Sequence, residues 1–302
     1  MDISVVICTH NPRADYLRRV LEALQGQTLP RAQWEMLLID NASDEPLAKT
    51  WDLSWHPNAR HILEKTLGLT PARLRGIDEA AAEILIFVDD DNVLCPTFLA
   101  DALRIGREWP QLGAWGSRQL PEFEKGPPAE QWKIDFWTPP VPRDVWSNNY
   151  DRKATPIGAG VCIRRSVAAK YAAIVRSDPW RMGLDRKGKS LMSGGDIDMA
   201  RVACDMGLGT GLFVCLELVH LIPARRTTDD YLIRLHEGFG YTIAVLDAVR
   251  GAKSPYRPWR DRLLNYVRLL KFPRDTWPLH VAYDRGRLRA LRDLREKSGP
   301  VH

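Results

Sequence analysis

The chain has 302 residues, of which 45% are hydrophobic and 27% are charged. This balance excludes a disordered chain and provides enough apolar residues for one large core or two smaller ones. The longest apolar runs fall far short of the roughly 18 residues that a membrane-spanning helix needs, and the N-terminus shows no basic leader. Five scattered cysteines without CxxC spacing predict neither a disulfide framework nor a zinc site. We therefore expect a globular cytoplasmic protein.

The formal net charge of +5 is unevenly distributed along the chain. Residues 250–302 contain 14 lysines and arginines against 5 aspartates and glutamates. Such a basic tail can bind nucleic acid, an anionic membrane surface or an acidic partner. Because the sequence has no helix-turn-helix, RNA-binding or zinc-finger signature, we expect no nucleic-acid partner.

The first predicted element in chain order is the apolar strand ISVVIC, and a helix follows it over residues 11–27. This helix has apolar residues at helical spacing, and Asn11 is expected to cap it, with Pro12 in its first turn. A second strand, EMLLID, ends at Asp40.

The next predicted elements are a helix from about Pro71 to Ala82, the strand ILIFV, and a helix that begins near Pro96. Strands that alternate with helices imply right-handed crossovers between parallel strands. The sequence therefore predicts an α/β fold with a mostly parallel, twisted sheet flanked by helices.

Polar and acidic residues follow three of the predicted strands, in the stretches TH, DNASD and DDDN. Ligands of such sheets bind outside the carboxyl ends of the strands. Carboxylates at the first and third positions of a tight turn suit Mg²⁺ or Mn²⁺, which can bridge phosphate oxygens. The stretch lacks the glycine and glutamate of an EF-hand loop, and no glycine-rich phosphate loop follows the first strand. A metal-bound diphosphate is the expected ligand.

Seven stretches in chain order resemble the signature blocks of family 2 glycosyltransferases: VVICTHN, LLIDNASD, GLTPARLRGI, FVDDDN, PIGAGVCIRR, GGDID and HLIPARR. The resemblance covers about residues 3–240. It implies a GT-A fold, in which a nucleotide-binding α/β half is joined to an acceptor-binding half. It also implies that a sugar is transferred from a nucleotide diphosphate with inversion at the anomeric carbon.

The resemblance assigns roles to donor-binding residues in the first half of the chain. It places Thr9 and Asp40 at the base and ribose of the nucleotide, and Arg73 near the base or the diphosphate. In the aspartate run, Asp89 or Asp90 would contact the sugar or ribose.

For the metal, the resemblance favours Asp91 as the direct ligand. His220 would complete the metal site or touch phosphate, although a lone histidine is more often structural. Arg226 would hold the diphosphate, since a guanidinium can bind two phosphate oxygens at once.

The GGDID block supplies the predicted catalytic base. Family members carry an acidic pair here, whose second member deprotonates the acceptor hydroxyl. Gly195 occupies the first position of the pair in this chain and Asp196 the second. Asp196 is therefore the expected base, and a plain helix N-cap is the alternative.

We expect three regions: a nucleotide-sugar-binding half at 1–95, an acceptor-binding half at 96–227 and a basic helical extension at 228–302. The extension carries an apolar stripe among basic residues, which is typical of a helix at a membrane interface. The stripe would either make a peripheral contact at the inner face of the cytoplasmic membrane, or pack on the catalytic domain or a second subunit. Its apolar residues are Leu263, Leu264, Val267 and Leu270, and its basic residues are Arg260, Arg262, Arg268 and Lys271.

The predicted function is transfer of a sugar from a UDP- or dTDP-sugar to a hydroxyl of a glycan or lipid-linked acceptor, with Mg²⁺ or Mn²⁺. Bacterial surface polysaccharide or glycoconjugate synthesis is the expected setting. The alternatives are a metal-dependent sugar nucleotidyltransferase and an inactive glycan-binding or scaffold protein.

Overall fold

A computed structural model describes most of the chain, namely residues 1–137, 141–188, 190–252, 267 and 269–297. The fold divides into two compact units. The first unit comprises Met1–Ser177 with Asp196–Ala224, and the second comprises Asp178–Gly195 with Arg225–His302. Each unit is described by itself.

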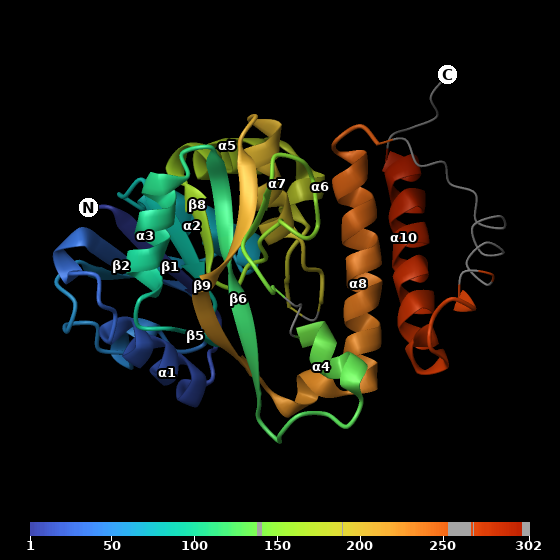
Figure 1. Ribbon diagram of the computed structural model, residues 1–302, viewed down its shortest axis with the longest axis horizontal. Helices are drawn as coiled ribbons and strands as arrows, with labels where there is room; N and C mark the ends of the chain where they lie inside the picture. Colours follow the sequence, from blue (N-terminus) through green and yellow to red (C-terminus); the bar gives the residue numbers. More distant parts are fainter. Residues whose placement is uncertain (138–140, 189, 253–266, 268, 298–302) are drawn as a thin grey trace. The chain divides into compact units, whose positions relative to one another are not determined.

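The first unit is built on one sheet, to which the described residues contribute nine strands (Figure 1). The strands are β1 (Ile3–Thr9), β2 (Trp34–Asn41), β3 (Ala59–Glu64), β4 (Ile84–Val88), β5 (Asn92–Leu94), β6 (Leu112–Phe123), β7 (Val145–Ser147), β8 (Val161–Arg164) and β9 (Gly209–Ile222). Their order across the sheet is β3-β2-β1-β4-β8-β6-β9-β5, and β7 pairs with β9.

The helices of the first unit are α1 (Ala14–Gln25), α2 (Leu69–Glu79), α3 (Phe98–Glu108), α4 (Gln131–Trp137), α5 (Arg165–Ser177) and α7 (Gly195–Asp205), whose first residue belongs to the second unit. Short 3₁₀ turns lie at Arg31–Gln33 and Leu47–Lys49. Helices α1 and α3 pack on one face of the sheet, and α2 packs on the other face beside α5. The predicted α/β fold is confirmed.

The sheet is mixed, although its first half is parallel as expected. Strands β1, β2, β3 and β4 pair in parallel, whereas β8 runs antiparallel to both β4 and β6. From β1 the chain moves outward to β2 and β3 on one side, then returns to β4 on the other side. The carboxyl ends of β1 and β4 therefore form a topological switch point, where sheets of this kind bind ligands.

The burial of β2 and β4 explains why their sequences are continuous apolar runs. Every residue of β2 and of β4 is buried, as expected for parallel strands that are covered on both faces. The edge strand β3 was not predicted, because its sequence ARHILE mixes polar and apolar residues and only one of its residues is buried.

Asn11 does not cap helix α1, so that prediction is wrong. The helix begins at Ala14, and the residue before it makes no side-chain cap bond. Asn11 instead has a positive φ of 47°, a conformation that asparagine tolerates better than most residues. Its side-chain amide donates to Asp44 Oδ2 over 3.0 Å and accepts from the Asp44 N–H over 2.9 Å. Asn11 thus joins the loops that follow β1 and β2.

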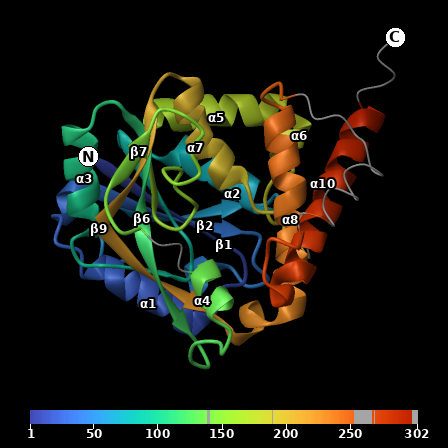
Figure 2. The same cartoon turned by 45° about the vertical axis from the view of Figure 1, so that its right-hand side comes forward.

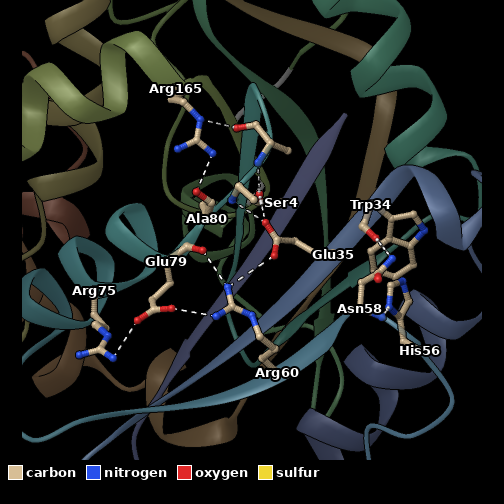
Figure 3. Close-up of polar contacts among 12 residues, drawn as sticks. Ser4, Trp34, Glu35, His56, Asn58, Arg60, Arg75, Glu79, Ala80 and Arg165 are labelled. Carbon is tan, nitrogen blue, oxygen red and sulfur yellow. Dashed lines mark hydrogen bonds and ion pairs between the residues drawn. The ribbon is translucent and has the colours of Figure 1, made fainter. Parts of the chain in front are cut away.

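A polar network at the other end of the sheet ties three strands to the end of α2 (Figure 3). Glu35 is buried, and its Oε1 accepts from Ser4 Oγ and from the Ala81 N–H, both over 2.6 Å. Arg60 on β3 lies 3.6 Å from Glu35 Oε2 and donates to Glu79 Oε2 over 2.8 Å. A buried carboxylate is tolerated when it is hydrogen-bonded in this way.

Helix α5 joins the same region through one arginine. Arg165 donates from Nε to the Ala82 carbonyl over 2.8 Å and from Nη2 to the Ala80 carbonyl over 2.6 Å (Figure 3). Both carbonyl groups belong to the connection that follows α2, so they have no partner within that helix. They hold the connection between α2 and β4 in place.

The second unit contains α6 (Pro179–Met182), α8 (Asp229–Ala248), α10 (Trp277–Lys297) and the 3₁₀ turn Arg274–Thr276. Helices α8 and α10 lie side by side in both views (Figures 1 and 2). A Cβ added at Gly240 would meet the Tyr283 carbonyl oxygen at 1.8 Å, and one at Gly286 would meet the Glu237 carbonyl oxygen at 1.9 Å. Glycine at these two positions allows the close approach, and the predicted C-terminal helical extension is confirmed for the described residues.

No described helix is both long and apolar enough to cross a membrane. Several residues of the predicted interfacial stripe lie outside the described residues, namely Arg260, Arg262, Leu263, Leu264 and Arg268. Within the described part, Val267 is 59% exposed and Leu270 is 74% exposed. Both the membrane contact and the domain limits at 95 and 227 stay predictions.

His56 predicts a loss of stability in acid. The residue is only 2% exposed, and its ring centroid lies 4.1 Å from that of the Trp34 ring. Burial lowers the pKa of His56 from 6.5 to about 4. Between these two values the unfolded chain binds a proton that the folded protein excludes, so stability falls as the pH falls.

We expect this residue to account for a loss on the order of 2–3 kcal/mol between pH 7 and pH 4. Urea unfolding at a series of pH values measures it. His56→Gln, which cannot titrate, should flatten the stability profile below pH 6.5. Parallel profiles for the variant and the wild type would contradict the assignment.

Candidate functional site

The turn Asp89–Asn92 carries the aspartate run from β4 into β5. Asn92 is fully buried and closes this turn: its Oδ1 accepts from the Asp89 N–H over 3.2 Å, and its own N–H donates to the Asp89 carbonyl over 3.1 Å. Its Nδ2 also donates to Asp91 Oδ1 over 3.0 Å. The asparagine therefore fixes the backbone of the turn and one of its three carboxylates.

Thr9 and Asp90 meet at the switch point of the sheet. Thr9 is the last residue of β1, and its hydroxyl donates to Asp90 Oδ2 just beyond the end of β4. Two residues that are 81 positions apart in the chain are thus brought together where a ligand is expected. Asp90 therefore contacts Thr9, and Asp89, the preceding residue, is half-buried.

Asp91 and His220, the predicted metal ligands, are also brought together. Strand β9 pairs with β5 so that His220 lies opposite Asn92, and the Leu221 N–H donates to the Asp91 carbonyl over 2.9 Å. His220 Nε2 lies 3.7 Å from Asp91 Oδ1. The Trp137 ring of α4 packs edge-on against the imidazole, with the ring centroids 5.7 Å apart. Both side chains are largely shielded from water.

The donor set fits a metal that is bound mainly through its substrate. Among the described residues, no group of three or more His, Cys, Asp and Glu side chains could hold a metal ion. Asp91 and His220 would supply two ligands, which suits Mg²⁺ or Mn²⁺ because these ions commonly keep waters and substrate phosphates as the rest of their shell. The residues present therefore fit a metal–diphosphate complex better than a closed structural metal site.

Asp40 is placed at the same edge of the sheet, at the end of β2. It is buried, and its two oxygens accept from the Ser43 and Leu47 N–H groups, each over 3.0 Å. These bonds shape the loop that follows β2. Each oxygen can accept a second hydrogen bond, so a nucleotide contact stays a prediction.

Asn41 is a positioning residue that the sequence did not reveal. Its Oδ1 accepts from the Gly68 N–H, and its Nδ2 donates to the Thr66 carbonyl, both over 2.8 Å. Gly68 precedes α2 and has a φ of 141°, which favours glycine. Asn41 thereby holds the start of the helix that carries Arg73.

Arg73, Gly158 and Asp196 form a second group within the first unit. Gly158 donates its N–H to Asp196 Oδ2 over 2.6 Å. A Cβ added at Gly158 would lie 2.9 Å from Arg73 Nη2 and 3.1 Å from Asp196 Oδ2, so the guanidinium and the carboxylate both approach this glycine. Gly158 lies in the PIGAG stretch, where sequence reasoning assigned it no role.

Asp196 is the second residue of α7 rather than the residue that precedes the helix. Its Oδ1 accepts from the Ile197 N–H over 2.8 Å, and its Oδ2 accepts from Gly158. The residue as a whole is only 9% exposed. Because each carboxylate oxygen can accept more than one hydrogen bond, the group can still take a proton from a substrate hydroxyl.

Arg226, the remaining residue predicted to bind the sugar donor, lies in the second unit within the 3₁₀ turn Ala224–Thr227. Its contact with the diphosphate stays a prediction.

The profile of the family described as "Glycosyl transferase family 2" matches residues 4–171, which is more than half of the chain. The chain belongs to this family. It is 29% identical over 92 residues to glycosyltransferase AglE of Haloferax volcanii, covering 30% of each chain. It is 32% identical over 96 residues to the uncharacterized glycosyltransferase YwdF of Bacillus subtilis, covering 32% of this chain and 35% of that protein. These matches span about a third of the relatives' own length.

Two solved structures share the fold across almost the whole chain. Mannosyltransferase PcManGT from Pyrobaculum calidifontis, in complex with GDP-Man and Mn²⁺, superposes with a TM-score of 0.60 at 17% identity, covering 97% of this chain and 88% of that chain. S. aureus TarS 1-349 in complex with UDP superposes with a TM-score of 0.54 at 14% identity, covering 99% and 91%. At these identities the likeness shows the fold, which is GT-A.

The geometry of the turn predicts that Asp91 carries metal-dependent binding of a nucleoside diphosphate. Asp91→Asn removes the negative charge that would attract the cation. We expect the affinity for UDP with Mn²⁺ to fall at least about tenfold, the equivalent of about 1.4 kcal/mol. Isothermal titration calorimetry with and without EDTA measures it.

Asp52→Asn is the matched control, because Asp52 is an exposed aspartate of the same unit that contacts only Ser54 in the bonds described for it. The control should bind like the wild type. Unchanged metal-dependent binding by Asp91→Asn would exclude Asp91 as the ligand.

Proposed function

We propose that the protein is an inverting, metal-dependent glycosyltransferase. In this proposal it moves a sugar from a nucleotide diphosphate sugar to a hydroxyl of a glycan or lipid-linked acceptor. The proposal rests on two contacts next to the switch point of the sheet: Thr9 contacts Asp90, and Asp91 lies beside His220. The family 2 membership of the chain supports it.

The donor would be a UDP- or dTDP-sugar. The solved neighbours include TarS complexes with UDP and UDP-GlcNAc and the PcManGT complex with GDP-Man, which support a nucleotide-sugar donor. The choice of UDP or dTDP rests on the family resemblance. PcManGT and GalNAc-T7 were also solved with Mn²⁺, which supports a divalent cation here. When bound, the cation would act as a Lewis acid on the departing diphosphate.

The two groups of residues would act on opposite sides of the anomeric carbon. Asp91 and His220 would hold the metal on the diphosphate, and Thr9 with Asp90 would orient the ribose or sugar. Asp196 would accept the proton of the acceptor hydroxyl while its oxygen attacks the anomeric carbon. As the new bond forms, the bond to the diphosphate would break, its electron pair would leave with the diphosphate, and the configuration would invert.

A base placed in this way contributes about 10²- to 10⁴-fold to the rate. Arg73 would add positive charge near Gly158, the residue that the Asp196 carboxylate also approaches. Transfer in a single displacement needs no covalent intermediate on the enzyme.

The acceptor class and a role in bacterial surface polysaccharide or glycoconjugate synthesis rest on the family resemblance. An inactive glycan-binding protein is the alternative that one observation favours, since Gly195 stands where the family carries an acid. Asp91 beside His220, together with Asp196, favours an enzyme, because the proposed reaction needs a metal ligand and a base.

Release of nucleoside diphosphate from a panel of UDP-, dTDP- and GDP-sugars tests the function. We expect release from at least one donor, dependent on Mn²⁺ or Mg²⁺ and abolished by chelator. No release from any donor with any divalent cation would refute the proposal.

Asp196→Asn should lower the transfer rate by at least about 10²-fold while donor affinity stays within a few-fold of the wild type. The reason is that the residue acts on the acceptor and not on the diphosphate. Asp205→Asn is the control, since Asp205 is a carboxylate at the other end of the same helix. Near-wild-type transfer by Asp196→Asn would mean that another group is the base.

A further inference from the structure

Gly195, the first residue of α7, has its side-chain position filled by a residue from another segment. A Cβ added at Gly195 would lie 2.2 Å from Asp185 Oδ2 and 2.6 Å from Asp185 Cγ. Asp185 Oδ1 also accepts from the Gly195 N–H over 3.0 Å. The Asp185 carboxylate therefore stands where a side chain of residue 195 would begin. Both residues belong to the second unit.

The segment that carries Asp185 is ordered by its own capping bonds. Asp178 caps α6, because its Oδ1 accepts from the Trp180 N–H over 2.9 Å and from the Arg181 N–H over 3.4 Å. The Leu184 N–H then donates to the Arg181 carbonyl over 3.2 Å. Asp185 follows directly and is only 6% exposed. The carboxylate is thus presented by a folded turn.

The segment that carries Gly195 is fixed from the other side by α8. A Cβ added at Gly194 would meet Thr242 Cγ2 at 1.9 Å, and one added at Gly238 would meet the Leu191 carbonyl oxygen at 2.8 Å. The backbone of 191–194 therefore lies against α8 at a separation that only glycine permits. Packing on both sides brings Gly195 to Asp185, so the contact does not depend on a mobile surface side chain.

We propose that Asp185 is a positioning residue of the transfer reaction, whose carboxylate replaces from a separate segment the acidic side chain that Gly195 lacks. This rests on the proposed function. The carboxylate accepts a charge-assisted hydrogen bond from the first N–H of α7, where negative charge is also favoured by the helix dipole. Glycine has the greatest backbone freedom of the amino acids, and Gly195 is bonded directly to Asp196. Fixing Gly195 therefore fixes the backbone from which the base projects.

The expected cost of losing this contact follows from the sensitivity of catalysis to geometry. Misplacement of a reacting group by about 1 Å can lower a rate by about 10²-fold. Asp185→Ala should therefore lower kcat by about 10- to 100-fold while the KM for the donor changes little. Asp185→Asn keeps an oxygen that can accept the Gly195 N–H, and it should retain most of kcat.

Moving the carboxylate to residue 195 gives the decisive test. Gly195→Glu alone places a Cβ against Asp185 and should lower kcat. Asp185→Ala combined with Gly195→Glu removes the clash and restores a carboxylate at this place, so kcat should recover to within a few-fold of the wild type. The two changes should then be strongly non-additive.

Thermal unfolding of every variant separates positioning from folding, because a purely structural contact would change stability without selective loss and recovery of kcat. Asp178→Asn, a nearby carboxylate change that keeps the cap oxygen, should leave kcat unchanged. Wild-type kcat in Asp185→Ala would overturn the proposal, as would a double variant no faster than Asp185→Ala.

Failure of this inference and failure of the proposed function give different results. If Asp196→Asn abolishes transfer but Asp185→Ala leaves kcat unchanged, only the inference about Asp185 fails. If the wild type transfers no sugar from any donor, the proposed function fails, and the inference falls with it.

Discussion

The closure of the Asp89–Asn92 turn by the buried Asn92 side chain is the interaction on which the candidate site depends. A carboxylate taken out of water is costly unless it is hydrogen-bonded, and Asn92 provides such a bond to Asp91. The same turn leads into β5, whose pairing with β9 brings His220 opposite Asn92. One asparagine therefore links the end of a buried strand to both predicted metal ligands.

The opposite end of the sheet supports this arrangement through α2. Glu35 and Arg60 connect β1, β2 and β3 to the end of that helix, while Asn41 holds its beginning. Arg73 lies between these two anchors and is only 3% exposed. Its guanidinium and the Asp196 carboxylate both approach Gly158. The proposed site residues that come from β1, β9, α2, α7 and the turn after β4 all belong to the first unit.

Much of this was predictable from sequence, for physical reasons. Continuous apolar runs marked β1, β2 and β4, and the polar and acidic residues that follow those runs marked the ligand-binding edge of the sheet. Edge strand β3 was not predicted, because its mixed pattern carries little signal. Asn11 looked like a helix cap in the sequence, yet its positive φ and its bonds to Asp44 decide its role.

Two kinds of contact could not be predicted from the sequence. One kind is made by backbone groups, and the other occupies the space that a glycine leaves without a side chain. Gly158 and Asn41 act through main-chain bonds, and such bonds leave no periodic pattern. In the sequence, Gly195 indicates only that an acidic residue is missing. Nothing in the local sequence shows that the carboxylate of Asp185, ten residues earlier, occupies the side-chain position of Gly195. A missing functional group can thus be supplied by a neighbour that only the fold identifies.

The central claim is that the strand-end carboxylates hold a metal on a nucleoside diphosphate, and locating the metal tests it most directly. Crystals of the protein grown with UDP and Mn²⁺ would give an anomalous difference map. The account predicts a single strong manganese peak beside the Asp91 carboxylate and the UDP phosphates. A manganese ion bound with UDP at any other group of side chains, with Asp91 outside its coordination shell, would contradict it.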